Sequence, residues 1–133
     1  MPSYLKQLCV PRQSVFDTQR RDTVLDISDL VFDRIDPSSF FEENFITEGM
    51  KTLLQQGFMR LEGKSQQGVF KLKQAMGGGK THNLLTLGLL AKHPEFRQKV
   101  MGKIHQVDPN LGSVKVVAFS GENRMLPLEF GAL

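Results

Sequence analysis

The feature that most limits the possible folds is the stretch "VFKLKQAMGGGKTHNLLTLGLL", residues 69–90. In it, consecutive glycines, a lysine and a threonine join a segment of alternating polar and apolar residues to a leucine-rich segment. Alternation with a period of two predicts a strand, and leucines on nearly every side predict a buried helix. Because glycine adopts backbone conformations that other residues avoid, the stretch predicts a strand that turns sharply into a helix.

The residues after the glycines suit phosphate binding. In the Walker A pattern, G-x-x-x-x-G-K-[ST], backbone N–H groups surround the β-phosphate, the lysine reaches the β- and γ-phosphates, and the hydroxyl ligates magnesium. Gly79, Lys80 and Thr81 occupy its last three positions, whereas Gln74 stands where its first glycine is expected. A helix that starts at Lys80 adds N–H donors and a positive dipole end. We therefore expect a phosphate-binding loop; the alternative is a glycine-rich turn that only joins a strand to a helix.

The order of the predicted elements gives the fold class. Residues 69–73 are predicted to form a strand, residues 80–91 a buried helix, and residues 113–120 a second strand rich in β-branched side chains. Between the last two, "HPEFRQKVM" predicts a short helix that starts near Pro94. This connection is long enough for the two strands to be parallel. The expected class is α/β, with a partial P-loop NTPase fold (strand, phosphate loop, helix, parallel strand) over residues 68–133.

Residues 1–67 carry helical signals instead. Asp36 and Pro37 suit the N-cap and first position of one helix, and Thr47 and Gly63 suit the start and end of a second. Apolar residues of the second helix recur at helical spacing and predict one buried stripe: Met50, Leu53, Leu54, Phe58 and Leu61. A similar pattern earlier in the chain comprises Ile27, Leu30, Val31 and Ile35. We expect a helical N-terminal segment before an incomplete nucleotide-binding domain.

Composition limits the environment and the ligands. The 17 Lys and Arg residues against 14 Asp and Glu give a net charge of +3, and the basic residues are scattered. Nucleic acid or an anionic ligand is therefore permitted but not required. Cys9, the only cysteine, has no internal disulfide partner and is expected to be a small buried apolar residue. No apolar run is long enough to span a membrane, and the expected location is cytoplasmic.

Three segments together resemble a known family: "VPRQSVF", "DPSSFFEENFITEGMKTLLQQGFMRLEG" and "LKQAMGGGKTHNLLTLGLL". They are similar to the start of large bacterial AAA+-like ATPases of uncharacterised function, whose hallmark is a GGGKTH phosphate loop, and the likeness covers roughly residues 10–120. By position, the resemblance implies that ATP phosphates bind Gly77, Gly78, Gly79, Lys80, Thr81 and His82, with Thr81 as a ligand of Mg²⁺. A solitary histidine in a first helical turn is more often structural, so both roles stay open for His82.

The resemblance also implies a biological setting. Such ATPases are commonly encoded beside DNA methyltransferases and other restriction or phage-defence components, which implies a role in a DNA-directed bacterial defence system. The implied partners are ATP, a DNA methyltransferase or other defence protein, and further copies in a homo-oligomer. Contact with DNA is expected to be indirect or to lie in another part of a longer protein.

Hydrolysis of ATP is not expected of this chain alone. The reaction needs an acidic residue after another strand and usually an arginine finger. Ser120 stands where the acid is expected, and Glu122, two residues later, is the catalytic candidate. Because few residues follow Thr81, we expect an N-terminal part of a larger ATPase. The alternative is a truncated, non-catalytic protein-interaction module that retains a phosphate loop.

Overall fold

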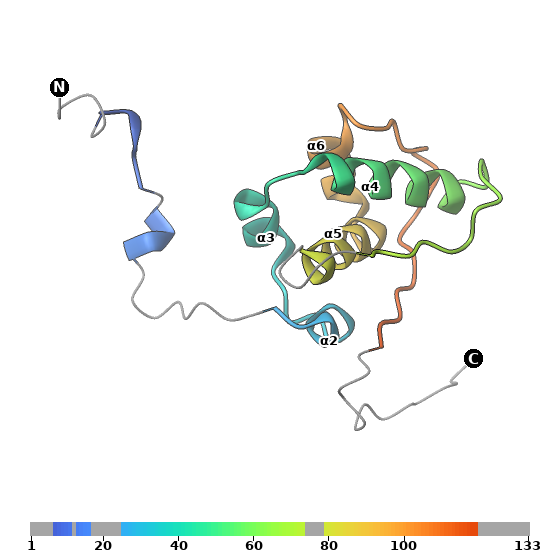
Figure 1. Cartoon of the computed structure of the whole chain (residues 1–133), viewed down its shortest axis with the longest axis horizontal. Helices are drawn as coiled ribbons and strands as arrows, with labels where there is room; N and C mark the ends of the chain where they lie inside the picture. The colour runs from blue at the N-terminus through green and yellow to red at the C-terminus, as the bar shows by residue number, and fades with distance from the viewer. Residues whose placement is uncertain (1–6, 12, 17–24, 74–78, 120–133) are drawn as a thin grey trace.

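The computed structural model describes residues 7–11, 13–16, 25–73 and 79–119, and every regular element in them is helical (Figure 1). In chain order the elements are η1 (Gln13–Phe16), α2 (Ile27–Val31), α3 (Pro37–Glu43), α4 (Glu48–Leu61), α5 (Lys80–Lys92), η2 (Pro94–Phe96) and α6 (Arg97–Met101), where η denotes a 3₁₀ helix. Helices α2 and α4 both contact α5, which lies at the centre of the group in Figure 1. The short η1 lies apart from this group.

The helix starts that the sequence predicts before residue 68 are confirmed. α3 begins at Pro37, and the carboxylate of Asp36 accepts a hydrogen bond from the Ser39 N–H at 3.0 Å. α4 begins after Thr47, whose hydroxyl accepts a hydrogen bond from the Met50 N–H at 3.3 Å. The N–H groups of the first helical turn have no carbonyl acceptors within the helix, and these side chains accept hydrogen bonds from them instead. Because the cap and the N–H groups are only a few residues apart, a short stretch of sequence is enough to predict where the helix starts.

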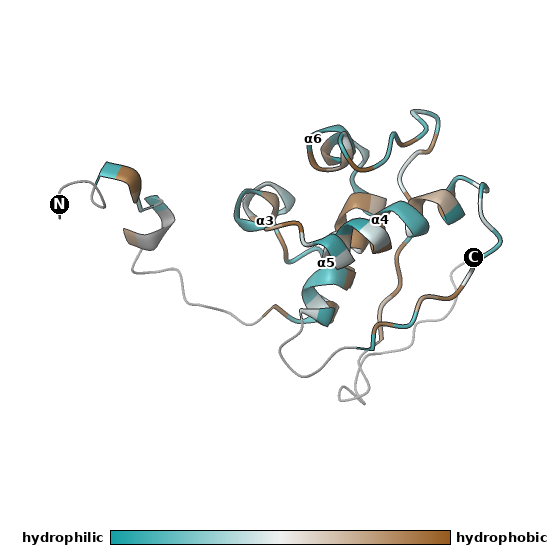
Figure 2. Ribbon diagram, turned by 45° about the horizontal axis from the view of Figure 1, so that its top comes forward, coloured by the Kyte–Doolittle hydropathy of each residue, from teal (hydrophilic) through white to brown (hydrophobic). Residues whose placement is uncertain are grey.

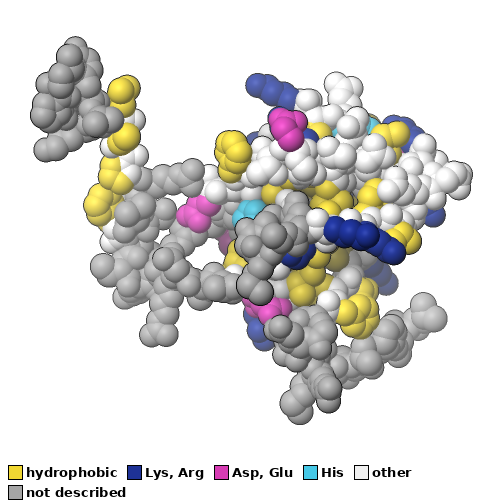
Figure 3. All heavy atoms as spheres, in the orientation of Figure 1, with side chains coloured by type: hydrophobic (Ala, Val, Ile, Leu, Met, Phe, Trp, Pro, Cys, Tyr) yellow, Lys and Arg dark blue, Asp and Glu magenta, His cyan; other side chains and the backbone are white. Residues whose placement is uncertain are grey.

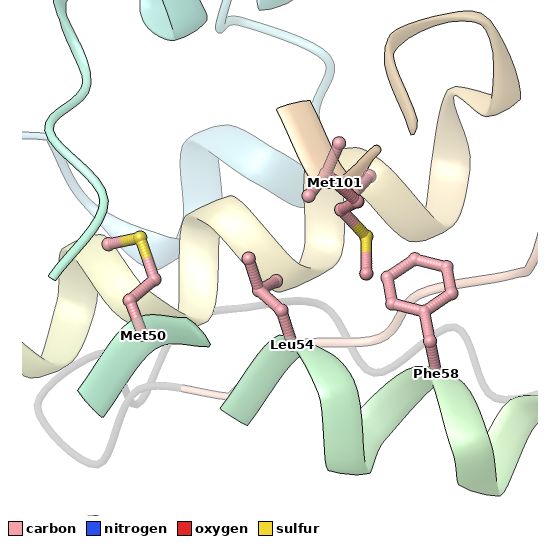
Figure 4. Packing of buried hydrophobic residues seen from close by; sticks show 5 residues of the cluster. Met50, Leu54, Phe58 and Met101 are labelled. Carbon is pink, nitrogen blue, oxygen red and sulfur yellow. The ribbon is translucent and has the colours of Figure 1, made fainter. Parts of the chain in front are cut away.

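A first hydrophobic cluster joins α4 to α5 and α6. Its buried members are Met50, Leu54 and Phe58 of α4, Leu90 of α5 and Met101 of α6. Figure 4 shows Leu54, Phe58 and Met101 turned toward one another. Burial of side chains of this size stabilises the folded state by about 1.5–3 kcal/mol each. The predicted stripe of α4 therefore faces the core over most of its length.

The last residue of the predicted stripe departs from the prediction. Leu61 is 37% exposed, whereas Leu53, the remaining member, is buried. Leu61 is the last residue of α4, and it lines an open apolar cavity rather than facing the core.

A second hydrophobic cluster joins α2 and α3 to α5. It is formed by Leu30, Phe40, Leu85 and Leu89. Both clusters combine residues from the two sides of residue 68, and the α2–α5 and α4–α5 contacts cross the same position. The division into a segment 1–67 and a domain 68–133 stays a prediction.

Two glycines allow α5 to approach its neighbours closely. A Cβ atom added to Gly57 of α4 would lie 3.1 Å from Leu87 Cδ1 of α5. A Cβ atom added to Gly88 of α5 would overlap the Leu30 side chain of α2. Glycine inside a helix lowers its intrinsic stability by about 1 kcal/mol, and the close contacts of buried side chains offset this loss.

The predicted strands are not present among the described residues, so the α/β fold class is wrong for this part of the chain. Exposure does alternate from residue 113 to residue 119, with Val114, Val116 and Ala118 half-buried between exposed neighbours. Hydrophobic residues of this segment and of residues 69–73 are brown in Figure 2. A strand, however, also needs a neighbouring backbone that exchanges ladder hydrogen bonds with it. Neither segment forms such a ladder within the described ranges, and residue 120 lies outside them.

Candidate functional site

α5 begins at Lys80, where the sequence predicts it. Gly79 precedes it with φ 76° and ψ 23°, in the left-handed region that glycine enters without a steric penalty. The Gly79 carbonyl accepts the first helical hydrogen bond, from the Asn83 N–H at 2.9 Å. The glycine-rich stretch therefore ends in a turn that requires its last glycine.

The start of α5 lacks a side-chain cap within the described residues. Helices α2, α3 and α4 each have one, from Asp26, Asp36 and Thr47. Gly79 and Thr81 are exposed and Lys80 is half-buried, so solvent reaches the turn. The first N–H groups of a helix have no helical acceptors, and the dipole adds positive potential at this end. The geometry of this 13-residue helix therefore suits an anion such as a phosphate group.

Part of the predicted site lies outside the described residues, namely Gly77 and Gly78 of the loop and Ser120 and Glu122 of the catalytic segment. Thr81, the predicted magnesium ligand, lies on the exposed first turn of α5. A hydroxyl oxygen next to substrate phosphates is a common Mg²⁺ ligand because Mg²⁺ prefers oxygen and keeps several waters. In the described ranges, no group of three or more His, Cys, Asp or Glu residues is placed to hold a metal ion.

His82 makes structural contacts with the segment before α4. Its Nε2 lies 2.5 Å from the Asn44 Oδ1, and its ring stacks on Phe40 with centroids 4.8 Å apart. The Asn44 side chain also donates a hydrogen bond to the Thr86 hydroxyl at 3.3 Å, which links α3 to α5. Burial lowers the pKa of His82 below its ordinary value of 6.5, so the ring is neutral at pH 7. A phosphate-binding role for His82 stays a prediction.

The wider surface carries no concentrated basic patch on the face seen in Figure 3, where Lys and Arg side chains are dispersed. The visible charge distribution thus agrees with the scattered basic residues of the sequence. Long-range attraction of a polyanion such as DNA needs clustered positive charge.

A comparison with protein families matches residues 5–124, most of the chain, to the DUF499 N-terminal domain. The chain belongs to this family. The DUF499 match includes the glycine-rich stretch, α5 and both hydrophobic clusters. No curated protein and no solved structure matches the chain.

The DUF499 N-terminal domain also contains a buried carboxylate that sequence reasoning missed. The Glu62 side chain is fully buried and accepts hydrogen bonds from the Asp108 N–H at 2.6 Å and from Lys64 Nζ at 3.0 Å. His105 Nε2 lies 2.9 Å from the same carboxylate. Burial raises the pKa of Glu62, but these hydrogen bonds outweigh it and hold the pKa below its ordinary value of 4.5. Each contact joins the end of α4 to nearby loops, so the cluster has a structural role.

Two further expectations concern the environment of this DUF499 domain. Cys9 is exposed, so its predicted burial is wrong. Among the described helices, none has both the length and the apolar character that crossing a bilayer requires.

Proposed function

We propose that this chain binds the phosphates of ATP, with Mg²⁺, at the start of α5 as the nucleotide-binding part of a larger AAA+-like ATPase. The observation that supports the proposal is the start of α5 at Lys80, directly after a left-handed Gly79 and without a side-chain cap in the described chain. The proposed phosphate-binding residues are Gly77, Gly78, Gly79, Lys80, Thr81 and His82. The proposal concerns the loop and the helix start, and it does not require the two predicted strands.

The proposed groups have complementary roles. The Lys80 ammonium supplies a compact positive charge for the β- and γ-phosphates, and hydrogen bonds to charged groups are worth about 1.5–3 kcal/mol each. The helix dipole adds about 0.3–1 kcal/mol for an anion at an exposed N-terminus. The Thr81 hydroxyl would hold Mg²⁺ beside the phosphates. Lys80 therefore supplies the largest single side-chain contribution to affinity.

The experiment that tests this function compares Lys80→Ala with Lys73→Ala by isothermal titration of Mg-ATP. Both variants remove one positive charge, and Lys73 is exposed before the loop. Lys80→Ala should weaken binding by roughly 10- to 150-fold, which corresponds to about 1.5–3 kcal/mol. Lys73→Ala should bind like the parent chain. Equal affinity of the parent and Lys80→Ala would exclude the proposal.

We assign nucleotide binding, and not turnover, to this chain. An arginine finger alone raises phosphoryl-transfer rates by about 10³–10⁵-fold. For the catalytic acid, the sequence offers Glu122 as a candidate. The resemblance to AAA+-like ATPases supports a cytoplasmic role in a DNA-directed defence system, together with a DNA methyltransferase or other defence protein. Assembly into a homo-oligomer would allow a neighbouring copy to complete the site.

A second candidate function, protein binding, is favoured by an apolar cavity of about 510 Å³ beside α4 and α5. Its lining includes Leu61, Leu84 and Val117, which are 37%, 39% and 70% exposed. Exposed apolar groups that surround a cavity are typical of interaction sites. If copies of the chain associate here, Val117→Lys should reduce self-association in sedimentation velocity experiments. A monomeric parent chain would exclude self-association as its use.

A further inference from the structure

A cavity of about 470 Å³ lies beside the first turn of α5. Leu25, Ile35 and Phe40 provide its apolar lining, and Asp36, Glu43 and His82 are among its polar residues. This volume lies within the range of about 300–1,000 Å³ that is typical of small-molecule sites. His82 is the third residue of α5, so the cavity opens at the same end of the helix as the proposed phosphate site.

The lining suits a heterocyclic base better than a phosphate. Ser39 donates hydrogen bonds to Asp36 through its hydroxyl at 2.7 Å and its N–H at 3.0 Å, and these hold the pKa of Asp36 below 3.8. The carboxylate is thus ionised at neutral pH and would repel a phosphate. The one described cation of the lining, Arg34, lies 3.7 Å from the Asp29 carboxylate, which offsets its positive charge. A carboxylate can accept further hydrogen bonds, such as those from the exocyclic amino group of a base.

The aromatic lining provides a flat apolar surface. Phe40 and His82 stack at 4.8 Å with an angle of 27° between their rings, and both rings line the cavity. The contact between His82 and Asn44 fixes the imidazole in this position. Aromatic side chains that are held in place are common platforms for nucleobases, because every base has a π-face.

We propose that this cavity holds the adenine of the nucleotide whose phosphates bind at the start of α5, an inference that rests on the function proposed above. The base lies against Phe40 and His82, and its amino group faces the carboxylates of Asp36 and Glu43. A cavity at the side of the first turn receives the base, while the N–H groups at the helix end receive the phosphates. The larger apolar cavity is lined by α5 residues further along the helix, including Leu84, Leu87 and Gly88.

The test fills the cavity from an exposed position. Ser39→Trp places a large side chain at the cavity lining, and Ser38→Trp places the same side chain on an exposed neighbour that does not line the cavity. Ser39→Ala controls for the lost hydroxyl. Each variant of the full chain is titrated with Mg-ATP and with inorganic tripolyphosphate, and circular dichroism checks its fold.

The parent chain should bind Mg-ATP at least about tenfold more tightly than tripolyphosphate, a difference of about 1.4 kcal/mol. Ser39→Trp should remove this difference without weakening tripolyphosphate binding, whereas Ser38→Trp should preserve it, and the loss should be larger in Ser39→Trp than in Ser39→Ala. Equal affinities of the parent chain for the two ligands, or unchanged ATP affinity in Ser39→Trp, would overturn the adenine site and leave the phosphate site intact. Absence of binding to both ligands would overturn the proposed function and the adenine site together.

A second readout does not depend on the folding of a variant. Photolysis of the parent chain with 8-azidoadenosine triphosphate should label the segment 34–43, which contributes six of the described lining residues. Excess tripolyphosphate should reduce this labelling, because the two ligands share the phosphate site. Labelling confined to other segments would overturn the placement of the base.

Discussion

The two ends of α5 differ in how their backbone groups are satisfied. At the carboxyl end, all of the last four carbonyls accept hydrogen bonds from the following chain. The Leu89 carbonyl accepts from the His93 N–H, and the Lys92 carbonyl accepts from the Ser113 hydroxyl. The guanidinium of Arg97 donates to the carbonyls of both Leu90 and Ala91. The Ala91 carbonyl also accepts from the Val114 N–H. At the amino end, Gly79 offers no side chain, and no cap forms within the described residues.

Polar side chains, above all Arg97, satisfy the backbone groups at the carboxyl end of α5. Arg97 is buried, and its guanidinium also donates to the carbonyls of Leu111 and Gly112, so one side chain joins the helix end to a distant loop. Its Cζ lies 5.4 Å from the centroid of the Phe58 ring, which adds a cation–π contact. The carboxyl end is therefore completed by the protein itself, whereas the amino end is suited to an external anion.

The largest expected effect comes from breaking the carboxyl end with Arg97→Ala. The variant leaves buried carbonyls without their charged donor, so the free energy of unfolding should fall by about 3 kcal/mol or more. Arg60→Ala is the matched control, because Arg60 is exposed and donates to the Ser65 carbonyl at 3.0 Å. Urea denaturation should show a loss of about 0.5–1.5 kcal/mol for this control. Equal losses in both variants would show that the Arg97 contacts do not hold the helix end.

A smaller effect is expected from changing the amino end with Gly79→Ala. Alanine at φ 76° is strained, and the free energy of unfolding should fall by about 1–2 kcal/mol. Gly49→Ala, in α4, is the control: no neighbouring atom lies within 4 Å of an added Cβ. It should stabilise the chain by about 0.5–1 kcal/mol, since alanine favours helix. Stabilisation by Gly79→Ala in thermal unfolding would contradict the left-handed turn.

The smallest effect concerns the pH dependence of the carboxyl end. The Lys92 side chain donates a hydrogen bond to Asp33 and holds the pKa of that carboxyl below its ordinary value of 3.8. A lowered pKa contributes stability above the unfolded value, and this contribution is lost as the pH falls through the folded value. In Asp33→Asn, the melting temperature should therefore fall slightly less steeply than in the parent chain as the pH is lowered below 3.8. An unchanged slope would exclude a role for this exposed ion pair.

The sequence predicted the helices well because their signals are local. Asp36 and Thr47 cap helices through residues three positions away, and Gly79 and Lys80 set the start of α5 within one turn. The β-branched side chains of residues 113–119 predicted a strand, and this prediction is wrong within the described chain, although exposure alternates along the segment. A ladder depends on a second segment, and local composition does not say where that segment lies.

The contacts around the candidate site were less predictable because they join distant positions. Asn44 meets His82 across 38 residues, and Glu62 meets His105 across 43. Charged residues such as Arg97 are usually exposed, so composition gives no sign that one is buried. Phe40, which lines the cavity beside the first turn of α5, lies in a segment for which the sequence predicted only a short helix. Its proximity to α5 follows from the tertiary fold.

The central claim is that the amino end of α5 binds phosphate, and it is tested most directly by the backbone amide signals of the two helix ends. Mg-ATP is added to ¹⁵N-labelled chain and two-dimensional NMR spectra are recorded. The account predicts the largest shifts at the amides of Lys80, Thr81 and His82, with little change from Leu89 to Lys92, and the same pattern with tripolyphosphate. The claim would be contradicted if the signals of Lys80 to His82 did not shift at saturating Mg-ATP. It would also be contradicted if the main shifts were at the carboxyl end of α5.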